Sequence, residues 1–181
     1  MDVTLFRAPF SEGAPRSRAL LRRAASQYTG LADSALGPIA EGAQGKPYFS
    51  YLPHLHCSVT HSGDWWLCAF GAQPLGVDLQ LHRSHAEPSR LSQRFFHPRE
   101  DAWLARGQYR AFFDVWCAKE SWVKYTGTGF FQDPASFSVV DETGSFPRLP
   151  GMSLQLLPFL PGYSLCLCAA KISTWSLLEL V

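Results

Sequence analysis

The sequence predicts an α+β protein made of two α+β halves that pack together. Its 181 residues suffice for one compact domain or for two small halves with a shared core. A hydrophobic content of 46% with 13 Phe and 6 Trp is typical of a well-packed globular protein and argues against disorder. Each half contains short strand-like runs and at least one long helical window, with a seam near Pro74 and Gly76.

The first half is expected to contain a strand, a helix and a hairpin. Val3–Arg7 alternates like a strand, and Pro15–Tyr28 is a helical window that Gly30 ends. Residues 37–54 are rich in Gly and Pro and indicate a loop. A hairpin is predicted from two strand-like runs on either side of Ser62-Gly63-Asp64, namely Cys57–Thr60 and Trp65–Phe70.

The second half is expected to begin with a strand at Gly76–Gln80 and then to become helical. Two short helices are predicted to start near prolines, which are favoured in a first helical turn, and Gln108–Thr126 is the longest helical window. The short helices span Pro88–Phe96 and Pro98–Arg106, and the later strands are expected at Phe137–Asp141, Ser153–Leu157 and Tyr163–Ala170.

Charge and cysteine content limit the possible functions. A net charge of +1 gives no overall field toward nucleic acid or a membrane. Arginine groups near residues 7–23 and 90–110 favour local anion sites or an acidic partner, and the alternative is solvated helix faces. The five cysteines lack zinc-ligand spacing, so we expect buried reduced thiols. No run approaches 18 apolar residues and no signal peptide is recognisable, which favours a cytoplasmic protein.

The most informative segment lies in the longest helical window. Glu120 and Lys124 are four residues apart and share a helix face, Lys119 precedes them, and Gly127 and Gly129 end the helix. A carboxylate that can hold a cation, beside lysines that can hold anionic oxygens, suits a site for a metal-bound phosphate ester. The alternative is a surface helix with an ordinary Glu–Lys pair.

Three further segments carry polar residues in suggestive positions. Lys46 lies in the loop Gly45-Lys46-Pro47, and His61 follows Thr60 and precedes Ser62 at the end of a strand. In Gly76–Gln80 the alternation puts Asp78 and Gln80 on one strand face. Each has a structural alternative: a loop charge, a hydrogen-bonded structural histidine, or a carboxylate that accepts backbone N–H bonds.

Taken together and in this order, these segments resemble the 4′-phosphopantetheinyl transferase family, in its longer, monomeric surfactin-synthetase-activating type. The resemblance spans residues 45–130 and rests on five motifs: Gly45-Lys46-Pro47, Ser58-Val59-Thr60-His61-Ser62-Gly63, Gly76-Val77-Asp78, Arg94-Phe95-Phe96 with Glu100, and Trp116-x-x-Lys119-Glu120-x-x-x-Lys124 followed by Gly127-x-Gly129.

The resemblance implies a fold of two similar α+β halves, arranged as a pseudo-dimer in one chain. Residues 1–75 would form the first half, and residues 76–181 would form the second and carry most of the metal site. The implied reaction transfers phosphopantetheine from coenzyme A to a serine of an apo acyl or peptidyl carrier protein, and it releases adenosine 3′,5′-bisphosphate. A cytoplasmic monomer with no nucleic-acid or membrane partner is expected.

The resemblance also assigns roles to single residues. Asp78 and Glu120 would bind Mg²⁺, and Gln80 would bind it directly or through a water. Lys119 and Lys124 would pair with phosphate oxygens. The remaining coenzyme A contacts, at the 3′-phosphate and near it, would come from Lys46, His61, Arg18, Thr60 and Ser62. Glu100 or Glu120 would take the proton of the attacking serine, with Lys124 also in the catalytic set.

One position departs from many relatives, which have an acid where this chain has Gln80. A neutral amide is a weaker Mg²⁺ ligand, so the sequence predicts an active enzyme with looser metal binding. Four arginines with neighbouring aromatic residues are candidates for docking an acidic carrier: Arg94, Arg99, Arg106 and Arg110, beside Phe95, Phe96 and His97. Two other functions stay open, a metal-dependent phosphohydrolase and a non-catalytic coenzyme A-binding homologue.

Overall fold

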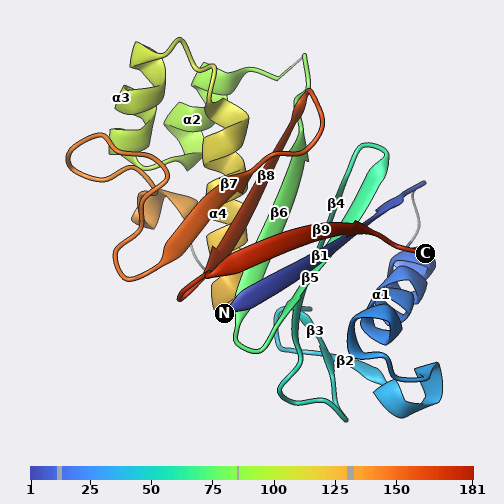
Figure 1. Ribbon diagram of the computed structural model, residues 1–181. Helices are drawn as coiled ribbons and strands as arrows, with labels where there is room; N and C mark the ends of the chain where they lie inside the picture. Colours follow the sequence, from blue (N-terminus) through green and yellow to red (C-terminus); the bar gives the residue numbers. More distant parts are fainter. Residues whose placement is uncertain (12–13, 85, 130–132) are drawn as a thin grey trace.

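The computed structural model describes residues 1–11, 14–84, 86–129 and 133–181. It is a mixed α+β fold, as the sequence predicts, with two main sheets and a long helix packed on each of them (Figure 1). The layers run in the order helix α1, first sheet, second sheet, helix α4, because alternate residues of each sheet face a helix on one side and the other sheet on the other.

The first sheet has the strand order β4-β5-β1-β9. Its strands span Asp2–Pro9 (β1), His56–Ser62 (β4), Trp65–Gly71 (β5) and Thr174–Glu179 (β9). The predicted hairpin is confirmed, since β4 and β5 pair antiparallel across Gly63-Asp64. β9 pairs parallel with β1, so the end of the chain returns to the sheet of the first half. The helix α1, Ala14–Thr29, covers the outer face of this sheet.

The segment predicted as loop between residues 37 and 54 contains a small hairpin. It consists of β2 (Ile39–Glu41) and β3 (Pro47–Phe49), and the short helix η1 (Asp33–Leu36) precedes it. Strands of three residues are too short to show an alternating pattern, which is why the sequence did not reveal them. β3 begins at Pro47, so the turn before it carries Gly45 and Lys46 toward the second half.

The second sheet has the strand order β6-β8-β7, with β6 at Leu75–Leu81, β7 at Ser153–Leu157 and β8 at Tyr163–Ala169. The helix α4, Phe112–Thr126, packs on its outer face against β6 and β8. The helices α2 (Pro88–Phe95) and α3 (Pro98–Arg106) lie together in the upper part of Figure 1, and the short helix η3 (Pro134–Ser136) follows α4.

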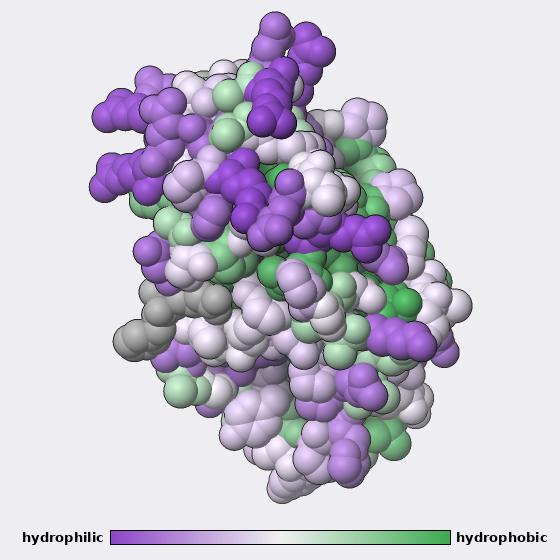
Figure 2. All heavy atoms as spheres, turned by 90° about the vertical axis from the view of Figure 1, so that its left-hand side faces the viewer, coloured by the Kyte–Doolittle hydropathy of each residue, from purple (hydrophilic) through white to green (hydrophobic). Residues whose placement is uncertain are grey.

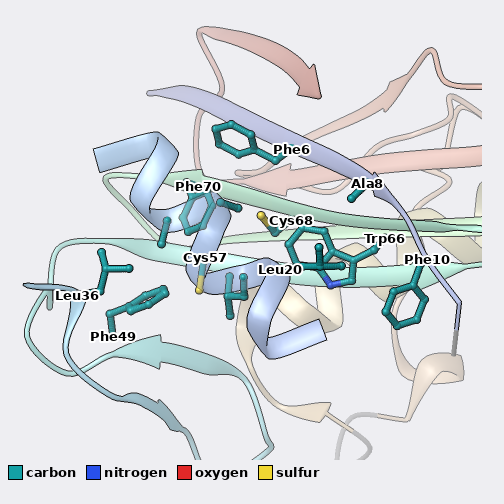
Figure 3. Close-up of a cluster of buried hydrophobic side chains, with 13 residues drawn as sticks. Phe6, Ala8, Phe10, Leu20, Leu36, Phe49, Cys57, Trp66, Cys68 and Phe70 are labelled. Atoms are coloured by element: carbon teal, nitrogen blue, oxygen red, sulfur yellow. The ribbon is translucent and has the colours of Figure 1, made fainter. Parts of the chain in front are cut away.

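Three hydrophobic clusters fill the spaces between these layers. The first, drawn in Figure 3, lies between α1 and the first sheet and includes Phe6, Trp66 and Phe70. The second lies between the two sheets, with Leu5 facing Val77 and its neighbours. The third joins α4 to the second sheet and to α3, with Val115, Leu104 and both Cys166 and Cys168. All five cysteines are buried free thiols, as expected.

Two predicted elements differ from the structure. α4 begins at Phe112 rather than Gln108, because Gln108 and Tyr109 have positive φ angles of 54° and 57° and cannot continue a right-handed helix. Phe137–Asp141 is not a strand. Its backbone bonds go elsewhere, since Val139 N–H donates to the side chain of Glu100 and not to a neighbouring strand.

β9 lies outside every predicted element. Its side chains are exposed or only half-buried along its length, so its sequence lacks the sharp apolar alternation of an inner strand. The predicted division between residues 75 and 76 falls at the start of β6. Within the residues that the structure describes, no helix is both long and apolar enough to cross a membrane.

Candidate active site

The site begins with an unusually close approach between β6 and α4. A Cβ atom at Gly76 would lie 2.0 Å from the Ser121 carbonyl oxygen and 2.4 Å from the Tyr125 backbone nitrogen. Only glycine therefore allows the strand and the last turns of the helix to touch at this point. The contact brings the side chains of the helix end over the strand residue two positions later, Asp78.

Asp78 is buried and bonded asymmetrically. Its Oδ1 atom accepts hydrogen bonds from the Lys124 ammonium at 2.6 Å and from the Thr60 hydroxyl at 3.0 Å. Its Oδ2 atom is buried and has no hydrogen-bond partner. A buried carboxylate oxygen without a donor is unfavourable, so this atom is an open ligand position.

Glu120 lies beside the Asp78–Lys124 pair, one helical turn before Lys124. Its pKa is raised, first by burial and then by the negative charge of Asp78, while Lys124 acts in the opposite direction. Two neighbouring carboxylates and one ammonium thus leave a local excess of negative charge. Such a site favours an additional cation.

A pocket of about 330 Å³ opens next to these groups. Glu120 and Lys124 line it from α4, Ser58 and Val59 from β4, and the turn before β3 contributes Gln44 to Pro47. Gly127, Gly129 and Pro134 close it beyond the end of the helix. Gly127 ends α4 in the left-handed conformation with φ 68°, which turns the chain around the pocket.

Lys46 lines the pocket but its ammonium group points into the protein. The Nζ atom donates to the carbonyl oxygens of Leu75 at 2.8 Å, Lys124 at 2.6 Å and Tyr125 at 3.4 Å. Burial lowers its pKa. All three ammonium protons are therefore committed to backbone oxygens, and they tie the β2–β3 turn to β6 and to the end of α4.

Glu100 and Lys119 form an internal ion pair away from the pocket. The Lys119 ammonium lies 2.9 and 2.7 Å from the two carboxylate oxygens and 2.8 Å from the Phe137 carbonyl oxygen. Glu100 is fully buried and also accepts from the backbone N–H groups of His97 and Val139. The pKa of Lys119 is lowered by burial, an effect that the charge of Glu100 opposes. Neither side chain is among the residues that line the pocket, and their roles as base and phosphate contact stay predictions.

The structure separates the other predicted coenzyme A contacts. Thr60 and Ser62 turn their hydroxyls toward the backbone of β6. His61 points to the opposite side of β4, is exposed, and packs on Phe10 with 4.8 Å between ring centroids. Arg18 is exposed and pairs with Glu41. His61 and Arg18 are not among the residues that line the pocket.

Gln80 lies two residues after Asp78 on β6, half-buried, and opposite Ser164 on β8. It therefore shares a strand face with Asp78, as the alternation predicted. Among the described residues, no group of three or more His, Cys, Asp and Glu side chains is gathered as a metal site. A cation here would depend on Asp78, Glu120 and neutral oxygens such as that of Gln80 or water, a donor set that suits a hard divalent ion.

Two features of the site were not recognised in the sequence. One is Gly76, whose role depends on a helix that is distant in the sequence. The other is the row of hydroxyls at Ser58, Thr60 and Ser62, which all face β6. Polar residues at every second position of a buried strand are a signal for such a row, because alternate residues share one face.

Comparisons with known proteins identify the family of this chain. Residues 74–168 match the family model described as the 4′-phosphopantetheinyl transferase superfamily. A 4′-phosphopantetheinyl transferase of Bacillus subtilis is 35% identical over 126 residues, which cover 66% of this chain and 54% of the relative. The 4′-phosphopantetheinyl transferase Sfp of Bacillus subtilis (strain 168) is 33% identical over 136 residues, or 70% of this chain and 60% of the relative.

A more distant relative is the 4′-phosphopantetheinyl transferase HetI of a Nostoc species, 30% identical over 132 residues that cover 68% of this chain and 46% of the relative. The chain thus spans about half the length of the curated relatives it matches. The family model includes β6, which carries Asp78, and α4, which carries Glu120 and Lys124. Because that match covers more than half of the sequence, the chain belongs to the 4′-phosphopantetheinyl transferase superfamily.

Proposed function

We propose that this protein transfers the 4′-phosphopantetheine group of coenzyme A to a serine hydroxyl of an apo acyl or peptidyl carrier protein. The reaction depends on Mg²⁺ and leaves adenosine 3′,5′-bisphosphate. Family membership supports the reaction class, since the named relatives are 4′-phosphopantetheinyl transferases. The observation that carries the proposal is the group of Asp78, Glu120 and Lys124: Glu120 and Lys124 line a pocket, and Asp78 is buried behind them in contact with Lys124.

The two carboxylates fit a divalent cation. Asp78 Oδ2 has no partner, and the raised pKa of Glu120 reflects burial and the nearby charge of Asp78. When bound, Mg²⁺ would neutralise charge on the pyrophosphate oxygens and on the leaving bisphosphate. Gln80 shares the face of Asp78 and provides an amide oxygen, directly or through a water, where an acid would hold the ion more tightly.

Lys124 places a positively charged ammonium group at the pocket. Its side chain is 29% exposed and spends one hydrogen bond on Asp78, so the other ammonium protons remain for phosphate oxygens. A fixed ammonium beside the pyrophosphate stabilises the charge that develops as the bond to the leaving group breaks.

The serine must lose its proton as it attacks the phosphorus that carries the pantetheine arm. A new P–O bond forms, the P–O bond to adenosine 3′,5′-bisphosphate breaks, and a base takes the hydroxyl proton. Glu120 suits this role better than Glu100, because Glu120 lines the pocket, where one of its carboxylate oxygens would hold the cation and the other would take the proton. Glu100 has both oxygens occupied inside the protein.

The carrier protein would dock near α2 and α3. Exposed arginines gather there at Arg94, Arg99, Arg106 and Arg110, and hydrophilic side chains crowd the upper part of the face in Figure 2, at the height of α2 and α3 in Figure 1. Arg94 lies over the ring of Phe95, with 5.0 Å to the centroid, and so offers both charge and an apolar surface. An acidic carrier surface complements such a region.

The test is to incubate the protein with Mg²⁺, coenzyme A and an apo carrier, and to measure the intact mass of the carrier. We expect the carrier to gain the mass of one phosphopantetheine group, and the Glu120→Gln variant to lose this activity. Hydrolysed coenzyme A with an unmodified carrier would indicate a phosphohydrolase and contradict the proposal. Binding of coenzyme A with no change in either substrate would indicate a non-catalytic homologue and would also contradict it.

A further inference from the structure

The two sheets are joined at β4 and β6 by side-chain hydroxyls. In an ordinary ladder, the backbone N–H groups of one strand donate to the carbonyl oxygens of the next. Here the N–H groups of β6 that face β4 donate to buried hydroxyls at every second position of β4. The three hydrogen bonds run from Val77 to Ser58 at 3.0 Å, from Leu79 to Thr60 at 3.2 Å and from Leu81 to Ser62 at 2.9 Å. We call these three contacts the hydroxyl ladder.

Thr60 differs from the two serines of this ladder. Its hydroxyl accepts from the Leu79 N–H group and also donates to Asp78 Oδ1 at 3.0 Å. A hydroxyl has one proton, and the Leu79 N–H group occupies an acceptor position of the oxygen. The Thr60 proton is therefore directed to Asp78, and the side chain links the backbone of β6 to a carboxylate of the same strand.

This bond makes the two oxygens of Asp78 unequal. Oδ1 takes both donors, Thr60 and Lys124, whereas Oδ2 is buried and takes none. Rotation of the carboxylate out of this orientation would break two hydrogen bonds to a charged group, and such bonds are stronger than neutral ones. Lys124 is partly exposed and lines the pocket, whereas Thr60 is buried and its contact within the hydroxyl ladder is a donor, the Leu79 N–H group.

We propose that Thr60 is a positioning residue that fixes the Asp78 carboxylate so that Oδ2 is the oxygen presented to a divalent cation. This role rests on the proposed function, because it concerns the cation of that reaction. The Thr60 hydroxyl acts through Asp78, since its hydrogen bonds go to Asp78 and to the Leu79 N–H group. The hydroxyl ladder thereby does more than join the sheets: one of its three members also sets the orientation of a metal ligand.

The experiment replaces Thr60 with Val, which keeps the shape and removes the hydroxyl, and with Ser, which keeps the hydroxyl. Ser62→Ala is the matched control, because it removes a ladder bond of the same kind that has no contact with Asp78. Mn²⁺ serves as the probe, and its binding to each protein in the presence of coenzyme A is titrated by electron paramagnetic resonance. Thermal unfolding of each variant is measured in parallel.

We expect Thr60→Val to weaken Mn²⁺ binding about tenfold, as the loss of a hydrogen bond to a charged group predicts. Thr60→Ser and Ser62→Ala should stay within about twofold of the original affinity. Ser62→Ala should lower the unfolding temperature, and Thr60→Val should lower it further because it also loses the bond to Asp78. In transfer assays, Thr60→Val should need more Mg²⁺ for half-maximal rate but keep most of its rate at saturating Mg²⁺. Thr60→Ala provides the same comparison if the valine variant does not fold.

Unchanged Mn²⁺ affinity in Thr60→Val would overturn the positioning role, and so would an equal loss of affinity in Ser62→Ala. In either case, if the protein without substitutions still modifies its carrier, the proposed transfer function stands. An unaltered protein that neither binds Mn²⁺ with coenzyme A nor modifies a carrier would overturn the proposed function and, with it, this role of Thr60.

Discussion

Two lysines of α4 each pair with a buried carboxylate, and the two pairs differ in the exposure of the lysine and in the number of hydrogen bonds that the carboxylate accepts. Lys119 is 3% exposed and its partner Glu100 is 0% exposed, and the pair is closed by further bonds to Phe137, His97 and Val139. Lys124 is 29% exposed, and its partner Asp78 keeps one oxygen without a partner beside the pocket. One pair is saturated inside the protein, whereas the other is open to a ligand.

The difference teaches that a charged motif on one helix can be divided between folding and function. We call Lys119 and Glu100 the inner pair. It connects α4 to the start of α3 and to the segment after η3, next to the third hydrophobic cluster. We call Lys124 and Asp78 the outer pair. It lies where Gly76 lets α4 contact β6, so the close approach of the two backbones fixes the position of Lys124 relative to Asp78. Four substitutions test this division, in order of their expected effect on the free energy of unfolding.

The inner pair should carry the largest stability effect. Lys119→Met leaves the carboxylate of Glu100 buried without its cation, and we expect the free energy of unfolding to fall by about 3–5 kcal/mol. Urea denaturation near neutral pH measures this. Adding Glu100→Gln to the same variant should restore part of the loss, because the uncompensated charge is then gone. A loss below about 1 kcal/mol would contradict the view that this pair is saturated and internal.

Gly76→Ala should have the next largest effect, since its Cβ meets backbone atoms of α4 that cannot turn away. We expect a loss of about 2–3 kcal/mol, as overpacking of a core predicts, together with reduced transfer because Lys124 moves relative to Asp78. Gly107→Ala is the control, because its φ is −92° and its Cβ would lie 3.7 Å from the nearest atom, the Leu104 carbonyl oxygen. Equal stability of the two variants would contradict the conclusion that only glycine at position 76 allows β6 and α4 to come this close.

The outer pair should matter more for transfer than for folding. Lys124→Met takes the cation from a buried carboxylate that keeps the Thr60 hydroxyl as a donor, and the lysine is itself partly exposed, so we expect the free energy of unfolding to fall by about 1–2 kcal/mol, less than in Lys119→Met. The transfer rate should nevertheless fall about 100-fold, as is usual when a charge-stabilising donor is removed. Steady-state transfer assays and urea denaturation on the same preparation separate the two effects. If Lys124→Met were strongly destabilised but transferred phosphopantetheine at the normal rate, the Lys124–Asp78 pair would serve folding rather than transfer, which would contradict the comparison.

Glu120→Gln should have the smallest effect on stability, and its sign should be positive. The folded protein raises the pKa of Glu120, so the folded state holds that proton more tightly than the unfolded chain does. This contribution to stability is present below the unfolded pKa, about 4.3, and is lost as pH rises through the raised value. Near neutral pH the variant should therefore unfold at a higher temperature than the unaltered protein, and the difference should shrink toward about pH 4.

A stability difference that grows as the pH falls would contradict the assigned direction of the Glu120 shift. The same shift predicts that protons compete with a cation at this carboxylate in mildly acidic solution. The Mg²⁺ concentration needed for half-maximal transfer should therefore rise as the pH is lowered.

Local patterns in the sequence predicted most of the fold. Alternation predicted β1, the β4–β5 hairpin and β6, and prolines at first helical turns predicted α2 and α3, with α3 matching its predicted bounds. The failures were elements whose formation depends on distant partners. Phe137–Asp141 has strand-like residues, but Val139 donates to Glu100 instead. The start of α4 depends on the positive φ angles of Gln108 and Tyr109, which residue type alone does not predict.

The sequence by itself determined the inventory of this site: a cation-binding type of carboxylate on a strand, a second carboxylate and two lysines on a helix, and hydroxyls at alternate positions of another strand. Only the tertiary structure decided which of these groups serve a ligand. Lys119 and Lys124 carry the same charge on the same helix, yet the packing of α3 closes one pair and the pocket leaves the other open. Burial and the number of available partners fix the role of a charged group, and both depend on contacts between residues far apart in the chain.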